Sequence, residues 1–392
     1  MSTPTDFEIE LERIDRDISE LEGRALADPL DTERATRFAY RLYQRGSLLG
    51  DFAQLEAAGA VLDDLIGRIS RVSDLCFLKA NLDFKFHRLA DVKRDLEMSR
   101  DLQGSTQGRA LQADLDFQEG RYDESRAGYE SLIREERTWD SLARLAHLKF
   151  KMGDDEGADG LYAEAVDELT AKEMRHYSWV ELQRGVLNLK RGRYADAQAH
   201  YERAARAYSG HWMVEEHLAE LLAAQGEFDK AIALYEKVIA RVPRPEFQQA
   251  LGELYAFMGK PEQSELWLDR ALAAYQESVE RGEVHYYHHL ADFYADARRD
   301  GAEAVKWALR DIELRENFST LAALAWALYR TGRFDESRET IDRALASGAK
   351  DAHLLRQAGT IHRAAGSNGK AEKYLQMAEE LNPHHHSFHV HR

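Results

Sequence analysis

Histidine is the residue type whose spacing most readily suggests chemistry in this chain. The segment 384–392 contains five histidines, namely His384, His385, His386, His389 and His391. Neutral imidazole nitrogens bind Zn²⁺, Ni²⁺ and Cu²⁺, so this segment is a candidate metal site. Specific metal sites also need fixed geometry and supporting hydrogen bonds, which a tail rarely supplies. The alternative is a flexible or docked tail that uses no metal.

A second histidine pair lies in the interior of the sequence. His285 and His289 are four positions apart, and on a helix they share one face, which is the spacing of a zinc-binding pair. Tyr286 stands where the zinc-protease motif H-E-x-x-H has its glutamate. The sequence therefore favours packing or groove residues here over a catalytic metal site.

Other catalytic patterns are missing from the sequence. It contains neither a Gly-x-Ser-x-Gly elbow nor a Gly-x-x-x-x-Gly-Lys-Ser/Thr phosphate loop, and no dinucleotide fingerprint is present. With 70 acidic residues, carboxylate pairs arise by chance and carry no information. We therefore expect no enzymatic activity and no cofactor.

Charge and composition narrow the class of partner. The formal net charge is −17, and nucleic acid is recognised by positive surfaces, so a nucleic-acid partner is disfavoured. The single cysteine, Cys76, excludes disulfides within the chain and lies in an apolar run typical of a buried thiol. The sequence shows neither a secretory signal nor a stretch apolar enough to span a membrane. These features predict a cytoplasmic protein.

A repeated turn motif organises most of the chain. The pattern Gly-x-Tyr/Phe-x-x-Ala/Ser begins at Gly120, Gly192, Gly226 and Gly332, and its variants continue it at steps of about 34 residues. The turn positions are 50, 87, 120, 153, 192, 226, 259, 299, 332 and 366. A fixed period of this size is the signature of a solenoid.

Each repeat predicts two amphipathic helices joined at that turn. Around Gly226, the apolar spacing predicts a first helix over 211–225 and a second over 228–241. The glycine supplies the left-handed conformation that ends the first helix, and the small residue after it lets the two helices approach closely. The two longest steps predict second helices extended around 168–175 and 276–283.

These repeats resemble the tetratricopeptide repeat (TPR) family. One copy carries its marker residues at Leu251, Gly252, Tyr255, Gly259, Ser264, Leu268 and Ala271, and another at Leu218, Ala219, Leu222, Gly226, Phe228, Ala231, Tyr235, Val238 and Pro243. A last copy carries them at Gly359, Gly366, Ala371, Leu375, Ala378 and Pro383. The resemblance implies an all-α, right-handed solenoid of about ten hairpins that binds proteins or peptides.

The resemblance is uneven along the chain, which predicts four regions. Residues 105–383 match well, 31–104 contain degenerate hairpins, and 384–392 form the histidine-rich tail. Residues 1–30 contain a heptad-like seam formed by Phe7, Leu11, Ile14, Ile18 and Leu21. That seam predicts either a capping helix or a helix that forms a homodimer.

The resemblance also implies which side chains face the concave groove. In the family, the first helix of each pair lines the groove. Its groove positions correspond here to Asp114, Phe117, His147, Phe150, Trp179, Glu216, Glu220, Glu253, Tyr286, His289, Phe293, Trp326, Tyr329, Arg356 and Arg363. This groove would be aromatic and acidic in its middle and basic at its C-terminal end, which suits a partner with a basic segment.

The predicted function is a protein-interaction scaffold that docks a partner segment in this groove. Two alternatives remain open at the level of sequence. One is a metal-handling or metal-sensing accessory protein that uses the histidine-rich tail. The other is a substrate-recognition subunit for a separate modifying enzyme.

Overall fold

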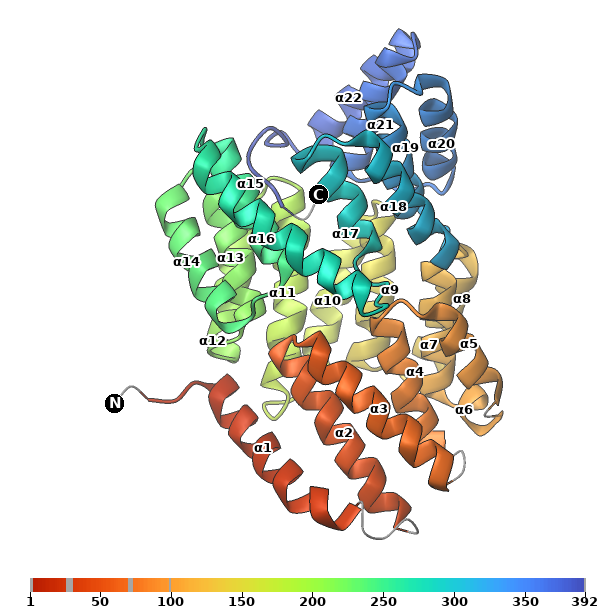
Figure 1. Ribbon diagram of the computed structural model, residues 1–392. Coiled ribbons are helices and arrows are strands. Elements are labelled where there is room, and N and C mark those ends of the chain that lie inside the picture. The colour runs from red at the N-terminus through yellow and green to blue at the C-terminus, as the bar shows by residue number, and fades with distance from the viewer. Residues whose placement is uncertain (1–2, 26–30, 70–72, 99, 391–392) are drawn as a thin grey trace. The chain divides into compact units, whose positions relative to one another are not determined.

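The computed structural model describes residues 3–25, 31–69, 73–98 and 100–390, and every regular element in these ranges is a helix (Figure 1). The chain divides into two compact units. Unit 1 comprises Met1–Leu115 and Tyr208–Gly210, and unit 2 comprises Asp116–Ala207 and His211–Arg392. The predicted all-α solenoid is confirmed. No helix in the described ranges is long and apolar enough to cross a membrane.

Unit 1 contains the N-terminal helix and the first helical pairs. Its helices are α1 (Asp6–Ala25), α2 (Thr32–Leu49), α3 (Phe52–Ile69), α4 (Ser73–Lys85), α5 (Leu89–Met98), α6 (Arg100–Gly104) and most of α7 (Thr106–Gln118). Helix α2 packs on α3 and α4 on α5. Leu62, Leu75 and Phe86 are fully buried between them. Cys76 is only 5% exposed, which confirms the predicted buried thiol.

Helix α1 buries part of its apolar seam within unit 1. It packs along α2, with Phe7 6% and Ile14 0% exposed. Its first turn is fixed by the Tyr208–Gly210 loop: the Phe7 amide donates to the Ser209 carbonyl at 3.1 Å, and the Tyr208 hydroxyl donates to Glu10 at 2.6 Å. Whether α1 caps the solenoid or forms a homodimer stays a prediction.

Unit 2 contains α8 (Tyr122–Glu135) and seven antiparallel pairs. The pairs are α9 (Trp139–Lys151) with α10 (Asp155–Asp167), α11 (Met174–Lys190) with α12 (Tyr194–Ala207), α13 (Trp212–Ala224) with α14 (Phe228–Arg241), α15 (Pro245–Phe257) with α16 (Pro261–Glu280), α17 (Tyr287–Asp292) and the π-helical η1 (Phe293–Ala297) with α18 (Gly301–Leu314), α19 (Phe318–Arg330) with α20 (Phe334–Ala346), and α21 (Ala352–Ala364) with α22 (Asn368–Leu381).

The repeat residues act as the sequence predicts. The backbone is left-handed at all ten turn positions, including the non-glycine residues His87 (φ 57°) and Arg299 (φ 54°). The small residue that follows is buried against the first helix, as in Ser337, whose hydroxyl donates to the Ala325 carbonyl at 2.6 Å. A Cβ at Gly185 would lie 2.2 Å from the Tyr201 ring, so glycine is required where these helices cross.

One of the two predicted helix extensions is wrong. Helix α16 continues to Glu280 and has 20 residues, as expected from the long step after Gly259. The other long step does not extend α10, which ends at Asp167. There the Glu173 carboxylate accepts hydrogen bonds from the Thr170 amide (3.0 Å) and hydroxyl (2.8 Å). These bonds stabilise a turn before α11 in place of further helix.

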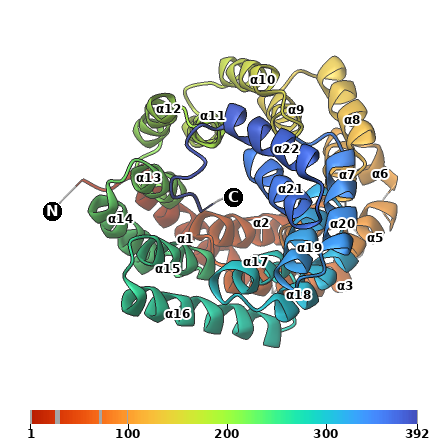
Figure 2. The same cartoon turned by 90° about the horizontal axis from the view of Figure 1, so that it is seen from above.

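The helices of unit 2 curve until distant parts of its sequence meet. The Asn317 side chain donates to the Gln118 carbonyl at 2.8 Å, 199 positions away, and Lys190 lies 3.8 Å from Asp351. Viewed from above, α9 to α18 follow an arc with the first helix of each pair on its inner side, and α19 and α20 continue this arc into a ring (Figure 2). The segment after α22 lies within this ring.

Candidate partner-binding site inside unit 2

The ring encloses an inner cavity of about 350 Å³, formed by first helices of the pairs. Helices α9, α11, α13, α15, α17 and α21, together with η1, contribute to its surface. Because these helices are held by their partners outside the ring, their inner faces are preformed. The cavity is therefore positioned by packing, and it is lined by apolar as well as polar side chains, which is the arrangement expected of a recognition surface.

One side of the cavity is acidic. The acidic wall comprises Glu246, Glu253, Asp292 and Asp296, from α15, α17 and η1, together with Glu220 of α13, which lines an adjoining pocket. Burial raises the pKa of Asp292 to about 6, and the nearby acidic groups Asp296 and Glu253 add to this, although His288 opposes it. Burial and the neighbouring carboxylates therefore raise the proton affinity of Asp292.

Another part of the inner surface is basic. The basic wall comprises His147, Lys151, Lys190 and His353, from α9, α11 and α21, together with Arg356 of α21, which lines the adjoining pocket. Burial and the charge of Lys190 lower the pKa of Lys151 to about 8. Burial also lowers the pKa of His147 to about 3, so this imidazole is neutral at physiological pH.

Asp351 is the carboxylate that balances part of the basic wall. Burial by itself would raise the pKa of Asp351, but Lys190, His353 and Lys151 hold it well below its usual range. Its side chain also caps α21 by accepting a hydrogen bond from the His353 amide at 2.9 Å. One carboxylate thus serves both the helix terminus and the cationic cluster.

The acidic wall is fixed by buried polar contacts. Arg244 forms an ion pair with Glu246, and the Tyr275 hydroxyl donates to Gln249 at 2.8 Å. The His289 ring stacks on Tyr275 with 6.1 Å between centroids. These contacts set the side-chain positions on α15 and α17 before any partner arrives.

The proposed helical spacing of His285 and His289 is not present. Helix α17 begins at Tyr287, so His285 precedes it and the two imidazoles do not share a helical face. His285 instead contacts Tyr286, with ring centroids 4.1 Å apart, and burial lowers its pKa to about 4. Both histidines pack against aromatic rings, which is the interpretation that the sequence favoured.

Aromatic residues of α19 also face the acidic wall. The Trp326 and Tyr329 rings stack with 4.8 Å between centroids, and the Trp326 indole donates to Asp296 at 3.0 Å. Trp326 is 7% exposed. Much of its surface is therefore used in packing within unit 2.

The groove residues expected from the sequence occupy several kinds of environment. Seven line cavities of unit 2: Phe117, His147, Phe150, Glu220, Glu253, His289 and Arg356. Four are buried away from these cavities: Glu216, Tyr286, Phe293 and Trp326. Trp179 and Tyr329 are partly buried, Arg363 is exposed, and Asp114 is partly buried in unit 1. Their role in binding a partner stays a prediction.

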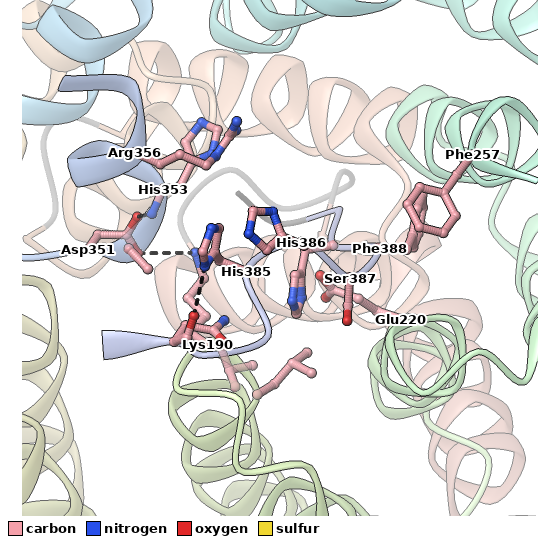
Figure 3. Close-up of a pocket in the computed structure, with 15 residues that line it drawn as sticks. Lys190, Glu220, Phe257, Asp351, His353, Arg356, His385, His386, Ser387 and Phe388 are labelled. Carbon is pink, nitrogen blue, oxygen red and sulfur yellow. Dashed lines mark hydrogen bonds and ion pairs between the residues drawn. The ribbon is translucent and has the colours of Figure 1, made fainter. Parts of the chain in front are cut away.

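The histidine-rich segment, defined here as residues 384–390, lies inside unit 2. The Val390 amide donates to Glu220 at 2.8 Å, and His384 stacks on Tyr194 with 5.0 Å between ring centroids. Phe388 is 2% exposed and lies 5.8 Å from the Phe257 ring (Figure 3). The segment is therefore docked on the inner wall. His391 lies outside the described residues.

The structure separates the histidines of this segment into two groups. His385 Nδ1 lies 3.0 Å from a Glu379 carboxylate oxygen, and the His385 and His386 rings are 3.7 Å apart. One ligand atom from each of these three residues lies within 4.8 Å of the others. His384 and His389 contact Tyr194 instead. Only the first group has the proximity that a metal site requires.

Sequence reasoning missed two features of this site. It did not place Lys151, Lys190, Asp351 or His353 on the inner wall. It also did not predict that the histidine-rich segment returns to the inner wall. Helical periodicity carries information about each pair, whereas this contact joins parts of the chain 170 positions apart.

Comparison with known proteins supports the repeat assignment. A family model described as tetratricopeptide repeat matches residues 182–246 and 322–386, which belong to unit 2 except for Tyr208–Gly210. These regions carry tetratricopeptide repeats, which confirms the resemblance. None of the curated proteins compared matches the chain in sequence.

Several solved structures are distantly similar. A chain of the APC/C hetero-tetramer Cut9–Hcn1 is 15% identical, with a TM-score of 0.45 over 88% of this chain and 74% of its own. A human IFIT1 dimer with PPP-AAAA is 15% identical, with a TM-score of 0.46 over 89% and 82%. MamA is 19% identical, with a TM-score of 0.34 over 43% and 96%. At this similarity none of them indicates what this chain binds.

Proposed function

We propose that the inner cavity of unit 2 docks an extended segment of a partner protein, and that the chain acts as a cytoplasmic scaffold, not as an enzyme. Tetratricopeptide repeats generally mediate protein–protein interaction, which supports the general class. The observation that carries the proposal is the docked histidine-rich segment. Its contacts with Tyr194, Glu220 and Phe257, beside the cavity that Val390 lines, support the docking of a polypeptide in this position.

The walls suggest how a partner would be recognised. Carboxylates on α13, α15 and α17 favour basic side chains, because charge complementarity improves both orientation and association rate. The walls are already fixed by ion pairs and ring stacking, so little conformational entropy is lost on the scaffold side when a partner binds.

A selection of random peptides displayed on phage tests the proposal on the full chain. We expect selected peptides to contain basic residues. We also expect the double substitution Glu253→Gln and Tyr329→Ala to weaken their binding at least about tenfold, because it removes a carboxylate of the cavity and an aromatic ring that stacks on Trp326 beside the acidic wall. Binding is measured by fluorescence anisotropy, with helical content checked by circular dichroism.

The matched control is Glu303→Gln, which removes a carboxylate of the same type from an exposed ion pair with Lys306 on α18. It should leave peptide binding unchanged. If the double variant keeps its helical content and binds the selected peptides as tightly as the wild type, the inner cavity is not the docking site.

A second candidate function is metal binding by Glu379, His385 and His386. Imidazole and carboxylate ligands suit Zn²⁺, and these three side chains already lie together. In titration calorimetry with Zn²⁺, His385→Ala and His386→Ala should each abolish one-to-one binding. His384→Ala and His389→Ala are the matched controls. An equal loss in all four variants would mean non-specific binding by a histidine-rich sequence.

A further inference from the structure

The most informative contact in the histidine-rich segment is made by an apolar side chain. Phe388 is 2% exposed, although the residues around it are mostly polar. Its neighbour Phe257 projects from the end of α15 and is 53% exposed, and the two rings meet edge to face at 5.8 Å. Phe388 thus lies in a seat formed by side chains of the inner wall.

The Phe388 seat is larger than the side chain in it. The adjoining cavity of about 650 Å³ is lined by Ala256, Leu268 and Ala297, by the carboxylates of Glu253, Glu265 and Asp296, and by Arg299. Glu265 already pairs with Arg298 at 2.6 Å, so the relevant carboxylates are Glu253 and Asp296. An aromatic group larger than phenylalanine would therefore fit, and a basic residue beside it would approach the carboxylates at the rim.

Backbone contacts fix the segment at both sides of Phe388. Before it, the Asn382 side chain is buried and accepts a hydrogen bond from the His384 amide at 2.8 Å. After it, the Val390 amide donates to the Glu220 carboxylate, whose side chain is 2% exposed. A backbone donor and an aromatic side chain are features that another polypeptide can supply.

We propose that residues 384–390 are an intramolecular ligand that occupies the partner-binding site, and that the partner displaces them with an aromatic residue followed by arginine or lysine. This inference rests on the proposed function. Residues 384–390 contain neither lysine nor arginine. A partner with lysine or arginine beside its aromatic side chain therefore brings a permanent positive charge to the acidic wall, in addition to a backbone donor such as the Val390 amide.

The covalent connection explains why such competition matters. A tethered segment competes at an effective concentration that for short linkers reaches the millimolar range. The apparent affinity for a partner falls in proportion to the fraction of molecules whose site is open. Only a sequence that recognises the Phe388 seat and the carboxylates together would then bind tightly.

The test uses the full chain and a fluorescent peptide with the sequence of residues 382–392. Two variants release the segment in different ways: Phe388→Ala removes the aromatic anchor, and Val390→Pro removes the amide donor to Glu220. We expect each variant to bind the peptide at least about tenfold more tightly than the wild type. Hydrogen exchange at the amides of 384–390 should become faster in both variants.

Two further comparisons test the chemistry of the occupant. The peptide with Phe388→Ala should lose binding to the opened variants. The peptide with His389→Arg should bind them more tightly, and this gain should disappear at about 1 M salt because the Debye length falls to about 3 Å. Leu266→Ala is the matched control, because it shortens an apolar side chain that is 51% exposed on α16.

The outcomes separate this inference from the proposed function. If phage-selected peptides require Glu253 and Tyr329 but bind the wild type and Phe388→Ala equally, the segment does not compete and the inference is wrong. If no peptide depends on the wall residues, the proposed function is wrong as well. Unchanged hydrogen exchange in Val390→Pro, which keeps Phe388, would also overturn the inference.

Discussion

The two walls of the inner cavity of unit 2 carry opposite charges, and both crowd like charges together. On the acidic wall the pKa of Asp292 rises to about 6, and on the basic wall the pKa of Lys151 falls to about 8. Each shift moves its group towards neutrality, because burial and like charges disfavour ionisation. Clusters of this kind are more typical of recognition sites than of structural cores.

The walls differ in how their charges are balanced. The acidic wall has internal partners: Arg244 pairs with Glu246, and the Trp326 indole donates to Asp296. On the basic wall, Lys190 lies 3.8 Å from Asp351, which is longer than the 3.0 Å hydrogen bond between Trp326 and Asp296. Lys151 also lies close enough to Lys190 for the two positive charges to repel each other. The comparison therefore predicts that the acidic wall contributes more to stability and that the basic wall is under electrostatic strain.

The largest expected loss of stability follows from breaking the ion pair between Arg244 and Glu246. Glu246 is 9% exposed, and Glu246→Ala leaves the guanidinium of Arg244 without this carboxylate in a largely buried position. Breaking a buried pair by removing one partner costs about 3 kcal/mol or more. The change is measured as a lower urea midpoint by circular dichroism.

The matched control is Glu303→Ala, which breaks an exposed pair with Lys306 and should cost less than about 1 kcal/mol. If both variants unfold at the same urea concentration, the acidic wall does not depend on its internal ion pair. The two walls would then differ in the sign of their charge but not in their contribution to stability.

The sequence predicted the scaffold of this site better than its charges. The turn residues and helix bounds around Gly226 follow from the repeat pattern, because each pair is fixed by contacts within about 34 residues. The basic wall joins α9 and α11 to α21, which meet only after the helices have curved through the ring. No local pattern encodes that curvature, so Lys151 and His353 could not be placed together.

The histidine-rich segment illustrates the same limit. Its composition indicated possible metal ligands, but the side chain that is most buried in it is Phe388. The metal-ligand group requires Glu379 from α22, and the docked position requires Glu220 from α13. Both depend on tertiary contacts, so the same eight-residue pattern of histidines was compatible with several roles.

A smaller change in stability, in this case a gain, is expected when the positive charge of Lys151 is removed. A folded-state pKa of about 8, below the usual value, means that the folded chain binds fewer protons than the unfolded chain above pH 8. The free energy of unfolding therefore rises with pH above about 8. At pH 7 Lys151 is charged in both states, so the full cost of burying its charge in the folded chain is present. Lys151→Met keeps the apolar stem and should stabilise unit 2 by about 1 kcal/mol at pH 7.

Thermal unfolding at several pH values checks this prediction. The advantage of Lys151→Met should shrink as the pH approaches 10, because the wild-type lysine then loses its charge in the folded state. Lys149→Met on the same helix is the matched control, since Lys149 pairs with Asp154 at 2.5 Å. A stabilisation of equal size in both variants would point to hydrophobicity and not to charge crowding.

The smallest expected effect is at Asp292, because its side chain is 44% exposed and solvent screens its charge. A raised folded-state pKa means that the folded chain binds more protons than the unfolded chain between about pH 4 and 6, so stability falls as the pH rises through that range. Asp292→Asn removes this penalty but also weakens the contact with His288, whose imidazole lies 3.4 Å from Asp292 and 3.5 Å from Asp311. We therefore expect a gain of less than about 1 kcal/mol at pH 7.5 and none at pH 4, measured as the difference in unfolding midpoint. A gain that is larger at pH 4 than at pH 7.5 would show that carboxylate crowding does not set the pH dependence of the acidic wall.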